Sequence, residues 1–433
     1  MNRFKFFLFA AFILSLISFL AVSQPVLLEQ ISNSGKYKKG EKIEYYFLSA
    51  GTITDSVNII VFKNNKEEIE KKTILIENEK QLVYSGSFDT PCTVMLVARY
   101  KEGMASLGSV VEPDLLKPGS TAPDDFKAFW KQQKKSLNAM PWEVKSTPVI
   151  NETIPEAFIC KDIEINCLGP KPARGYYVKQ SGADHGSAPA VLLVHAAGVK
   201  GSWCRSEPSN ALKYAKNGAI CFDLNAHGML NGQPEEYYDQ LEKGELKDYW
   251  MIGVTSRDDF YFRGMYLRLL RAIEFLTRQP EWDGKRILVI GESQGGGQAL
   301  AAAGLDSRVG AVVAIVPAMC DWLGTYAERR GGWPQIAESD AAREQMMKTI
   351  PYFDAANLLA GSRATIFTEI GFVDMNCPPA SVYAAVSQSK GRKIVIGVPY
   401  RAHHQPAAGS ELDKIWQETV YKQRKEFIDN YLH

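Results

Sequence analysis

Short runs of apolar and β-branched residues follow one another through the first part of the chain, with turn-prone residues between them. Five of these runs read IEYYFLS, SVNIIVFK, TILIE, QLVYSG and TVMLVARY, and none has the spacing of an amphipathic helix. Short strands separated in this way are typical of a small antiparallel β-sandwich. We therefore predict an all-β, sandwich-like (Ig-like) module over residues 24–112.

The pattern changes after this module. Residues 113–123, PDLLKPGSTAP, contain three prolines and a glycine, which predicts a linker. From about residue 188 onward, continuous apolar runs alternate with helical patterns, and the runs lie at 190–197, 218–225, 286–291, 310–318, 364–371 and 393–400. Such runs are typical of parallel strands that are covered on both faces.

Three segments of this second region have helical spacing. Their apolar residues fall on one face in each case: Phe126, Phe129 and Trp130; Phe262, Met265, Leu269, Ile273 and Leu276; and Leu412, Trp416, Val420 and Phe427. The predicted fold class of residues 124–433 is therefore α/β, with a mostly parallel sheet and helices on both faces.

The first residues have the pattern of an export signal. Arg3 and Lys5 precede an apolar run from Phe6 to about Val22, and small residues stand at Ala21 and Ser23. This order predicts a signal peptide over residues 1–23, cleavage after it, and a periplasmic or extracellular protein that has no membrane contact after cleavage. A retained anchor is the alternative, but a run of about 17 residues is at the lower limit for spanning a bilayer.

Charge and cysteine content exclude several classes of protein. Without Arg3 and Lys5 the chain has 48 basic and 49 acidic residues and no concentrated basic stripe, so we expect no nucleic-acid partner. Seven cysteines are few for 433 residues and do not indicate a disulfide scaffold, although a Cys160–Cys167 pair stays open. No CxxC motif or His/Cys cluster is present, so we expect no metal.

The strongest chemical motif is Gly291-Glu292-Ser293-Gln294-Gly295, between the apolar run RILVIG and the helical run GGQALAAAG. Strand, tight turn and helix around G-x-S-x-G are what a nucleophile elbow requires, and they predict the α/β-hydrolase fold. The start of the helix also makes the Gln294 backbone N–H a candidate oxyanion donor.

A serine nucleophile needs a base, and in this fold the chain order is Ser, then Asp or Glu, then His. Only His403 and His404 follow Ser293 within the body of the chain, because His433 is the terminal residue. For the acid, Asp374 follows the next-to-last strand, and Asp321 one strand earlier is the rival.

The remaining candidates belong to loops after predicted strands. Residues 192–203, LLVHAAGVKGSW, are placed to supply a second oxyanion donor, the Ala197 backbone N–H, whereas His195 is expected to be a structural, hydrogen-bonded residue. Four aromatic residues in such loops are expected either to stack on sugar rings or to pack in the core: Trp203, Trp322, Tyr326 and Trp333.

Residues 114–410 resemble the acetyl xylan esterase / cephalosporin C deacetylase family, carbohydrate esterase family seven. The similarity is carried by PDDFKAFW, by RGMYLRLLRAIEFLTRQPEWDGKRILVIGESQGGGQAL, by VPAMCDW and by GFVDMNCPPASVYAA. The resemblance implies a triad of Ser293, Asp374 and His403, backbone donors at Gln294 and Ala197, no cofactor, and a small acetylated saccharide as substrate. It leaves a homo-oligomer open, and the N-terminal β module marks a divergent member.

Three short motifs depart from the family pattern. His-Gly-Tyr is replaced by His195-Ala196-Ala197, Arg-Gly-Gln by Asn225-Ala226-His227, and His-Glu by His403-His404. The first change removes an aromatic side chain near the acyl pocket, and the last removes only the acidic neighbour of the base. An exported serine esterase acting on acetylated xylo-oligosaccharides or related sugars is therefore the leading prediction. A secreted serine peptidase or another α/β-hydrolase esterase, and a glycan-binding protein with a relict hydrolase domain, are the alternatives.

Overall fold

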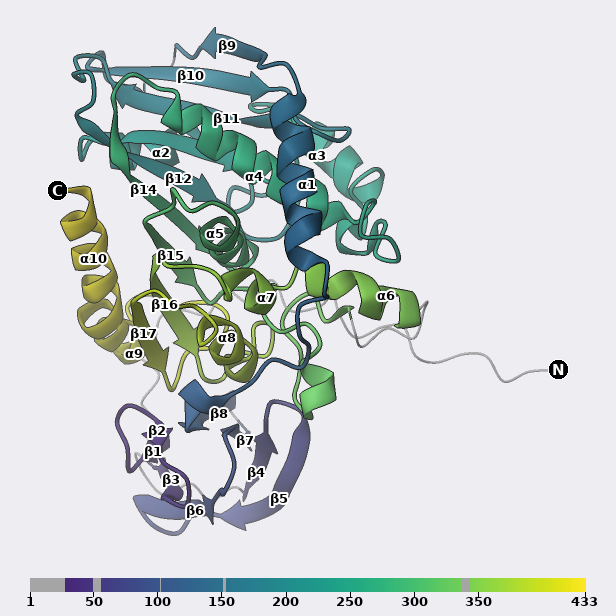
Figure 1. Cartoon of the computed structure of the whole chain (residues 1–433). Coiled ribbons are helices and arrows are strands. Elements are labelled where there is room, and N and C mark those ends of the chain that lie inside the picture. Colours follow the sequence, from purple (N-terminus) through teal and green to yellow (C-terminus); the bar gives the residue numbers. More distant parts are fainter. Residues whose placement is uncertain (1–27, 50–55, 102, 151–152, 337–342) are drawn as a thin grey trace.

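The computed structural model describes residues 28–49, 56–101, 103–150, 153–336 and 343–433 (Figure 1). The predicted signal peptide, residues 1–23, lies outside the described residues. Among the described residues, no helix combines the length and the apolar character that crossing a bilayer demands.

The N-terminal region is all β. A three-stranded sheet has the order β1-β3-β6, and a five-stranded sheet has the order β2-β8-β7-β4-β5. The strands are β1 (Leu28–Gln30), β2 (Lys36–Tyr37), β3 (Lys42–Leu48), β4 (Ser56–Lys63), β5 (Glu67–Leu75), β6 (Lys80–Ser87), β7 (Cys92–Tyr100) and β8 (Gly103–Val111). Both sheets contribute alternate residues to one core, which contains Tyr45, Phe47, Ile59 and Leu96. The strand pairs are antiparallel, as predicted, except that the short strand β2 pairs with β8 in parallel.

Residues 113–123 connect this module to the rest of the chain. They contain a short 3-10 helix, η1 (Pro113–Leu115), and the following Leu116 is only 4% exposed. This connection is therefore packed against the protein along part of its length.

A nine-stranded sheet forms the centre of the second region, in the order β17-β16-β15-β14-β12-β13-β11-β10-β9. The strands are β9 (Val144–Pro148), β10 (Phe158–Ile165), β11 (Ala173–Gln180), β12 (Ala188–Val194), β13 (Ile220–Asn225), β14 (Trp282–Glu292), β15 (Ala311–Ile315), β16 (Thr365–Gly371) and β17 (Lys393–Val398). Strands β12 to β17 are parallel and coincide with the six predicted apolar runs. The antiparallel strands β9 to β11 have no counterpart in the prediction.

Helices cover both faces of this sheet (Figure 1). The helices are α1 (Phe126–Ala139), α2 (Pro208–Ala215), α3 (Glu235–Lys243), α4 (Tyr261–Thr277), α5 (Gln294–Leu305), α6 (Arg343–Thr349), α7 (Ala355–Leu359), α8 (Pro379–Val386), α9 (Glu411–Trp416) and α10 (Lys422–Leu432). Buried residues of α1, α4, α5, α7 and α8 join one core, and those of α2 and α10 join the core on the opposite face.

The alternation of side chains along each strand explains this division. Val191 and Leu193 of β12 point into the α2/α10 core, while Ala190, Leu192 and Val194 point into the α4/α5 core. Strands that bury both faces are apolar at most positions, which is the pattern that the sequence shows. The fold class is confirmed: an α/β-hydrolase fold behind an all-β region.

The five predicted apolar residues of α4 are each fully buried, and each contributes about 1.5–3 kcal/mol through burial. The C-terminal helix is less regular than expected, because a π-helical turn, η6 (Gln417–Tyr421), separates α9 from α10. Trp416 and Val420 are buried at this turn, where the helical face meets β17.

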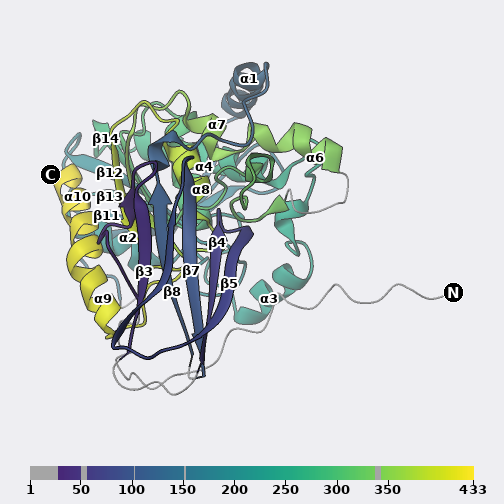
Figure 2. The ribbon, with the colours of Figure 1, turned by 90° about the horizontal axis from the view of Figure 1, so that it is seen from below.

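The all-β region lies below β16 and β17 in Figure 1. In Figure 2 it covers the face of the α/β region that is seen from below. Residues from β7 and β8 contact the segments that follow β16 and β17. These two segments include the loops on which Asp374 and His403 lie.

Candidate active site

Ser293 stands at the sharp turn between β14 and α5. Its backbone is in an uncommon region, with φ 55° and ψ −118°, which is strained for any residue with a side chain. A Cβ atom at Gly291 would lie 2.3 Å from the Gly295 carbonyl carbon, and one at Gly295 would lie 2.4 Å from the Val194 oxygen. Only glycine fits at both places, so the two glycines of the motif are needed to hold the serine in this turn.

The structure brings Ser293, His403 and Asp374 together in one hydrogen-bonded series. His403 Nε2 is 2.9 Å from Ser293 Oγ, and His403 Nδ1 is 2.9 Å from Asp374 Oδ2. These residues come from three different strand ends, after β14, β16 and β17. In this arrangement the imidazole can accept the serine proton at Nε2 while its Nδ1–H donates a hydrogen bond to the carboxylate.

Asp374 is fully buried, so its carboxylate depends on hydrogen bonds from the protein. Its Oδ1 accepts the backbone N–H groups of Asn376 at 2.8 Å and Cys377 at 2.9 Å. Oδ2 therefore remains for His403, and the orientation of the carboxyl group is fixed by its own loop.

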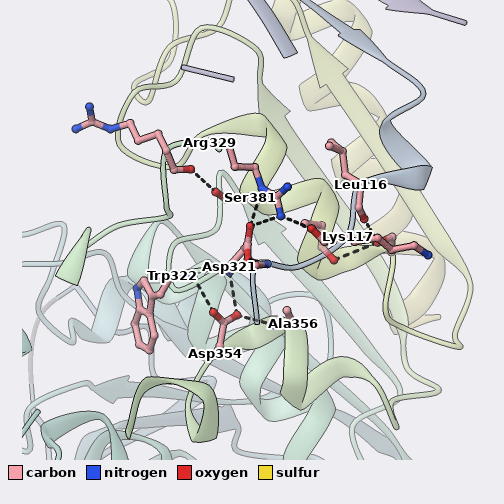
Figure 3. Close-up of polar contacts among 12 residues, drawn as sticks. Leu116, Lys117, Asp321, Trp322, Arg329, Asp354, Ala356 and Ser381 are labelled. Atoms are coloured by element: carbon pink, nitrogen blue, oxygen red, sulfur yellow. Dashed lines mark hydrogen bonds and ion pairs between the residues drawn. The ribbon is translucent and has the colours of Figure 1, made fainter. Parts of the chain in front are cut away.

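Asp321, the rival acid, has a different surrounding (Figure 3). Its carboxylate accepts the Gly119 backbone N–H at 2.6 Å and the Arg329 guanidinium at 2.7–2.8 Å. Arg329 also donates to the Lys117 carbonyl, and the neighbouring Asp354 accepts the backbone N–H groups of Asp321 and Trp322. Asp321 thus ties the connection between the two regions to the loop after β15 and does not contact His403.

His404 differs from His403 in both exposure and contacts. Its side chain is exposed and lines an open cavity over Ser293. Its ring centroid is 5.5 Å from that of His403, at an interplanar angle of 73°. It does not belong to the hydrogen-bonded series of Ser293, His403 and Asp374.

A buried ion cluster lies beside the loops that carry Ser293 and His403, and no motif in the sequence analysis marked it. Arg401 and Glu369 are both fully buried and paired, and the Trp416 indole donates to Glu369 at 2.6 Å. Arg401 also reaches Glu292 at 3.2 Å. Because Arg401 is two residues from His403 and Glu292 precedes Ser293, the cluster joins the two loops. A glutamate inside the apolar run of β16 was the signal that this strand contacts a buried cation.

The loop after β12 carries Ala196 and Ala197 into the same cavity. Trp203 Nε1 donates to the Ala197 carbonyl at 3.2 Å, and His227 Nε2 donates to the Gly198 carbonyl at 2.9 Å. The Tyr261 hydroxyl lies 2.6 Å from His227 Nδ1. Burial lowers the pKa of His227 to about 3, so the ring is neutral and can accept from Tyr261 while it holds the loop.

Gln294 begins helix α5, where backbone N–H groups of the first turn have no partner within the helix. The Gln294 side chain is turned away toward Tyr249, whose hydroxyl donates to it at 2.5 Å. Gln294 thus offers a backbone N–H at the first position of α5, directly after Ser293.

His195 is hydrogen-bonded to the buried Asp223, as expected for a structural histidine. Burial lowers the pKa of the His195 imidazole, but the charge and hydrogen bond of Asp223 outweigh burial and raise this pKa above its usual value. Asp223 also accepts the Glu207 backbone N–H at 2.8 Å, so the pair connects β12, β13 and the start of α2.

An open cavity of about 830 Å³ lies over Ser293 and His403. Trp203 and Trp333 line it, and the Trp203 side chain is 64% exposed. The other two aromatic candidates do not line it. Trp322 is fully buried and donates its indole N–H to the Trp333 carbonyl at 2.8 Å, and Tyr326 is exposed elsewhere on its loop. The expectation of Trp322 as a pocket residue is therefore wrong, because its polar atom has a partner inside the protein.

Several lining residues were not among the predicted candidates. Besides His404, the cavity wall includes Asn210, Lys213, Tyr214, Asn376 and Gln405. No local sequence pattern marks these positions, since they meet only when α2 and the loops after β16 and β17 fold against one another.

Among the described residues, one group of side chains has the composition of a metal site. Asp374, Cys377 and His403 have ligand atoms within 4.8 Å of one another. Asp374 and His403 already use their facing atoms for the hydrogen bond between them, and burial raises the pKa of the Cys377 thiol, which favours its protonated form.

All seven cysteines are buried and free. Cys160 and Cys167 belong to the cores on opposite faces of the sheet, so the two do not form a pair.

Comparison with known proteins agrees with this geometry. Residues 114–417 match the acetyl xylan esterase family (AXE1). Acetyl esterase Axe7A of Xylanibacter ruminicola is 32% identical over 317 residues, which cover 72% of this chain and 70% of that protein.

Two solved structures share the fold. The acetyl xylan esterase of Paenibacillus sp. R4 has a TM-score of 0.59 and 24% identity, covering 73% of this chain and 98% of that chain. Acetyl xylan esterase 1 of Thermoanaerobacterium sp. JW/SL YS485 has a TM-score of 0.60 and 19% identity, covering 74% and 98%. The family match spans most of the α/β region that carries the site, and it favours an ester hydrolase over the peptidase considered above. The chain therefore belongs to the acetyl xylan esterase family and is a carboxylic ester hydrolase.

Proposed function

We propose that this ester hydrolase removes O-acetyl groups from acetylated xylo-oligosaccharides or related acetylated sugars, with Ser293 as nucleophile, His403 as base and Asp374 as the orienting acid. The observation that carries the proposal is the hydrogen-bonded series from Asp374 through His403 to Ser293, at 2.9 Å for each link. A nucleophile, a base and an orienting acid at these distances are suited to acyl transfer.

In the first half of the reaction, Ser293 Oγ attacks the carbonyl carbon of the acetyl group while His403 Nε2 takes the serine proton. Asp374 Oδ2 stabilises the imidazolium that forms and holds it in the required tautomer. The negative charge on the carbonyl oxygen is stabilised by the backbone N–H groups of Gln294 and Ala197, and losing one such donor costs about 10²–10³ in turnover. His403 then gives the proton to the departing sugar oxygen, which leaves an acetylated Ser293.

Water completes the second half. His403 Nε2 takes a proton from water as the water oxygen attacks the acetyl carbon of Ser293. Collapse of the tetrahedral intermediate releases acetic acid, which loses its proton to solvent to become acetate, and the proton held by His403 Nε2 returns to Ser293 Oγ. No redox change or external group is required in either half.

The cavity supports a sugar substrate. Its volume of about 830 Å³ is within the range of small-molecule sites, and Trp203 offers an exposed aromatic face at its edge. Ala196 and Ala197 leave space beside the serine where a bulky side chain would restrict the acyl group. The relative from Xylanibacter ruminicola is an acetyl esterase, which supports the same substrate class.

The test compares Ser293→Ala with the parent protein on p-nitrophenyl acetate. Turnover should fall by at least about 10⁴-fold, because the bond-forming atom is removed. The matched control is Ser307→Ala, which removes an exposed serine hydroxyl just beyond α5 and should leave turnover unchanged. Equal turnover in Ser293→Ala would rule out the mechanism.

Substrate class is tested by measuring acetate released from acetylated xylo-oligosaccharides, other acetylated glycans and cephalosporin C. The proposal expects the highest kcat/KM among the acetylated sugars. Hydrolysis of p-nitrophenyl acetate without release of acetate from any sugar would leave the triad in place and overturn the substrate assignment.

The same proposal includes export. Its support is the order of Arg3, Lys5, the apolar run and the small residues at Ala21 and Ser23. Cleavage after Ser23 should leave Gln24 as the first residue of the protein recovered from the periplasm or medium, as read by N-terminal sequencing. A mature protein that begins at Met1 would contradict it.

A further inference from the structure

The turn between β4 and β5 of the all-β region reaches the loop that carries Asp374. Asn65, in this turn, is 3% exposed, and its side-chain Nδ2 donates to the Asp374 carbonyl oxygen at 3.3 Å. The same Nδ2 is 3.5 Å from Met375 Sδ. A residue 309 positions away in the sequence therefore contacts the backbone of the orienting acid.

Asn65 is itself held firmly. Its Oδ1 accepts the Thr93 hydroxyl at 3.1 Å, which leaves Nδ2 directed toward Asp374. The preceding Asn64 accepts the Thr93 backbone N–H through its side chain at 3.1 Å, and its own carbonyl accepts the Arg330 N–H at 3.1 Å. Asn64 and Asn65 both have positive φ, 54° and 53°, a conformation that asparagine tolerates better than most residues.

Further contacts of the all-β region support the loops that carry Asp374 and His403. Met95 and Val97 of β7 form a buried cluster with Val373, beside Asp374. The Gly108 N–H of β8 donates to the Pro399 carbonyl at 2.8 Å, four residues before His403. A Cβ at Gly108 would lie 2.5 Å from the Phe372 Cβ, so the two backbones are in close contact.

The orientation of the Asp374 carboxylate depends on the position of the Asp374 backbone carbonyl. The Asp374 side chain accepts the N–H groups of Asn376 and Cys377, so the carboxylate and the following backbone form one small turn. Rotation of the peptide group after Asp374 would tilt this turn and move Oδ2 away from His403 Nδ1. A displacement of about 1 Å at such a group is enough to cost about 10² in rate.

We propose that Asn65 is a positioning residue for the triad: its amide fixes the Asp374 carbonyl, and the all-β region thereby sets the geometry of the acid relative to His403. The inference rests on the proposed function, since it assigns Asn65 a part in the same site. Asn65 acts through Asp374 and touches no reacting atom.

The test uses the full chain with two substitutions at one position. Asn65→Gly keeps access to positive φ and removes the amide, and Asn65→Asp keeps the shape and the acceptor for Thr93 but removes the donor to Asp374. Both should lower kcat for p-nitrophenyl acetate by about 10–100-fold with little change in KM. Rates are counted per active site by titrating the serine with an organophosphate, so that unfolded protein does not contribute.

The pH profile separates positioning from a purely structural role. A misplaced Asp374 stabilises the His403 imidazolium less, so in Asn65→Gly the acidic limb of kcat/KM should move to lower pH. The matched control for Asn65→Asp is Asn58→Asp, the same substitution at an exposed position of β4. It should leave kcat and the acidic limb of kcat/KM unchanged. If Asn65→Gly does not fold, Thr93→Val removes only the hydroxyl that orients the amide and should shift kcat and the limb in the same directions by a smaller amount.

The outcomes are distinguishable. Folded Asn65→Gly or Thr93→Val enzyme with parental kcat per active site and an unmoved acidic limb would overturn the positioning role. A parent protein without esterase activity would instead overturn the proposed function itself, before any variant is compared.

Discussion

At the scale of single residues, the two adjacent histidines have separate surroundings. His403 faces Ser293 and Asp374, whereas His404 is exposed at the cavity and stacks edge to face near His403. Chain order predicted that the base lies in this pair, and the resemblance favoured the first member.

We expect His403→Ala to lower kcat for p-nitrophenyl acetate by about 10⁴-fold, because it removes the imidazole that lies 2.9 Å from Ser293 Oγ. His404→Ala should retain a large fraction of the activity, since this ring is outside the hydrogen-bonded series. Steady-state kinetics of the two variants, prepared side by side, check both statements. A strong loss in His404→Ala with activity kept in His403→Ala would exchange the two assignments.

The residues of the triad were accessible from the sequence because each has a local signal. Ser293 lies in a glycine-flanked turn, and Asp374 and His403 each follow an apolar strand. Trp322 had no such signal: a tryptophan after a strand has the same local pattern whether it faces a cavity or the core. Trp322 is buried against Phe260 and Phe262, about 60 residues earlier in the sequence, and no local pattern reveals these partners.

At the scale of elements, His227 holds the loop after β12. It connects the end of β13 with the Gly198 carbonyl and with Tyr261 at the start of α4. Because burial lowers its pKa to about 3, the native protein keeps this ring neutral at a pH where the unfolded chain, with a usual histidine pKa, is protonated.

The sign of the effect on stability follows. Between about pH 6.5 and the native pKa the unfolded chain binds more protons, so the free energy of unfolding decreases as the pH is lowered, by up to about 1.4 kcal/mol per pH unit. His227→Gln removes this proton uptake, and it should therefore reduce the loss of stability between pH 7.5 and 5 by about 2 kcal/mol.

Urea unfolding of the parent and of His227→Gln at both pH values measures this difference. The variant should be less stable than the parent at pH 7.5, since hydrogen bonds of the neutral ring are lost, typically about 1–3 kcal/mol. His185→Gln makes the same substitution at an exposed site and should follow the pH dependence of the parent. Parallel curves for the parent and His227→Gln would show that His227 is not the group that titrates.

Elements were predictable in proportion to their apolar pattern. Strands β12 to β16 are mostly buried within their predicted apolar runs, the edge strand β17 is half-buried, and each of the six appeared as an apolar run. Strand β9 is exposed at all five positions and pairs only at the edge of the sheet, so no periodicity marks it. The π-helical turn Gln417–Tyr421 depends on how Trp416 and Val420 pack, and the helical pattern continues through it.

At the scale of the whole molecule, the all-β region and the α/β region form one structure through the catalytic loops. The sequence predicts a sandwich and a hydrolase fold as two units, because each has its own periodicity. It contains no signal for the contact between Asn65 and Asp374 or between Gly108 and Pro399, which arises from the shapes of two folded surfaces.

The length of chain between these partners has a consequence for biosynthesis. The turn at Asn65 is made early and the Asp374 loop late, because the two residues are 309 positions apart in the sequence. Domains generally fold in the order in which they are synthesised. We therefore expect the β region to fold before the last strands of the α/β region have been made. A nascent chain that stops between residues 293 and 374 contains Ser293 but lacks Asp374 and His403, so we expect it to be inert. Esterase activity should therefore appear only after His403 has been synthesised.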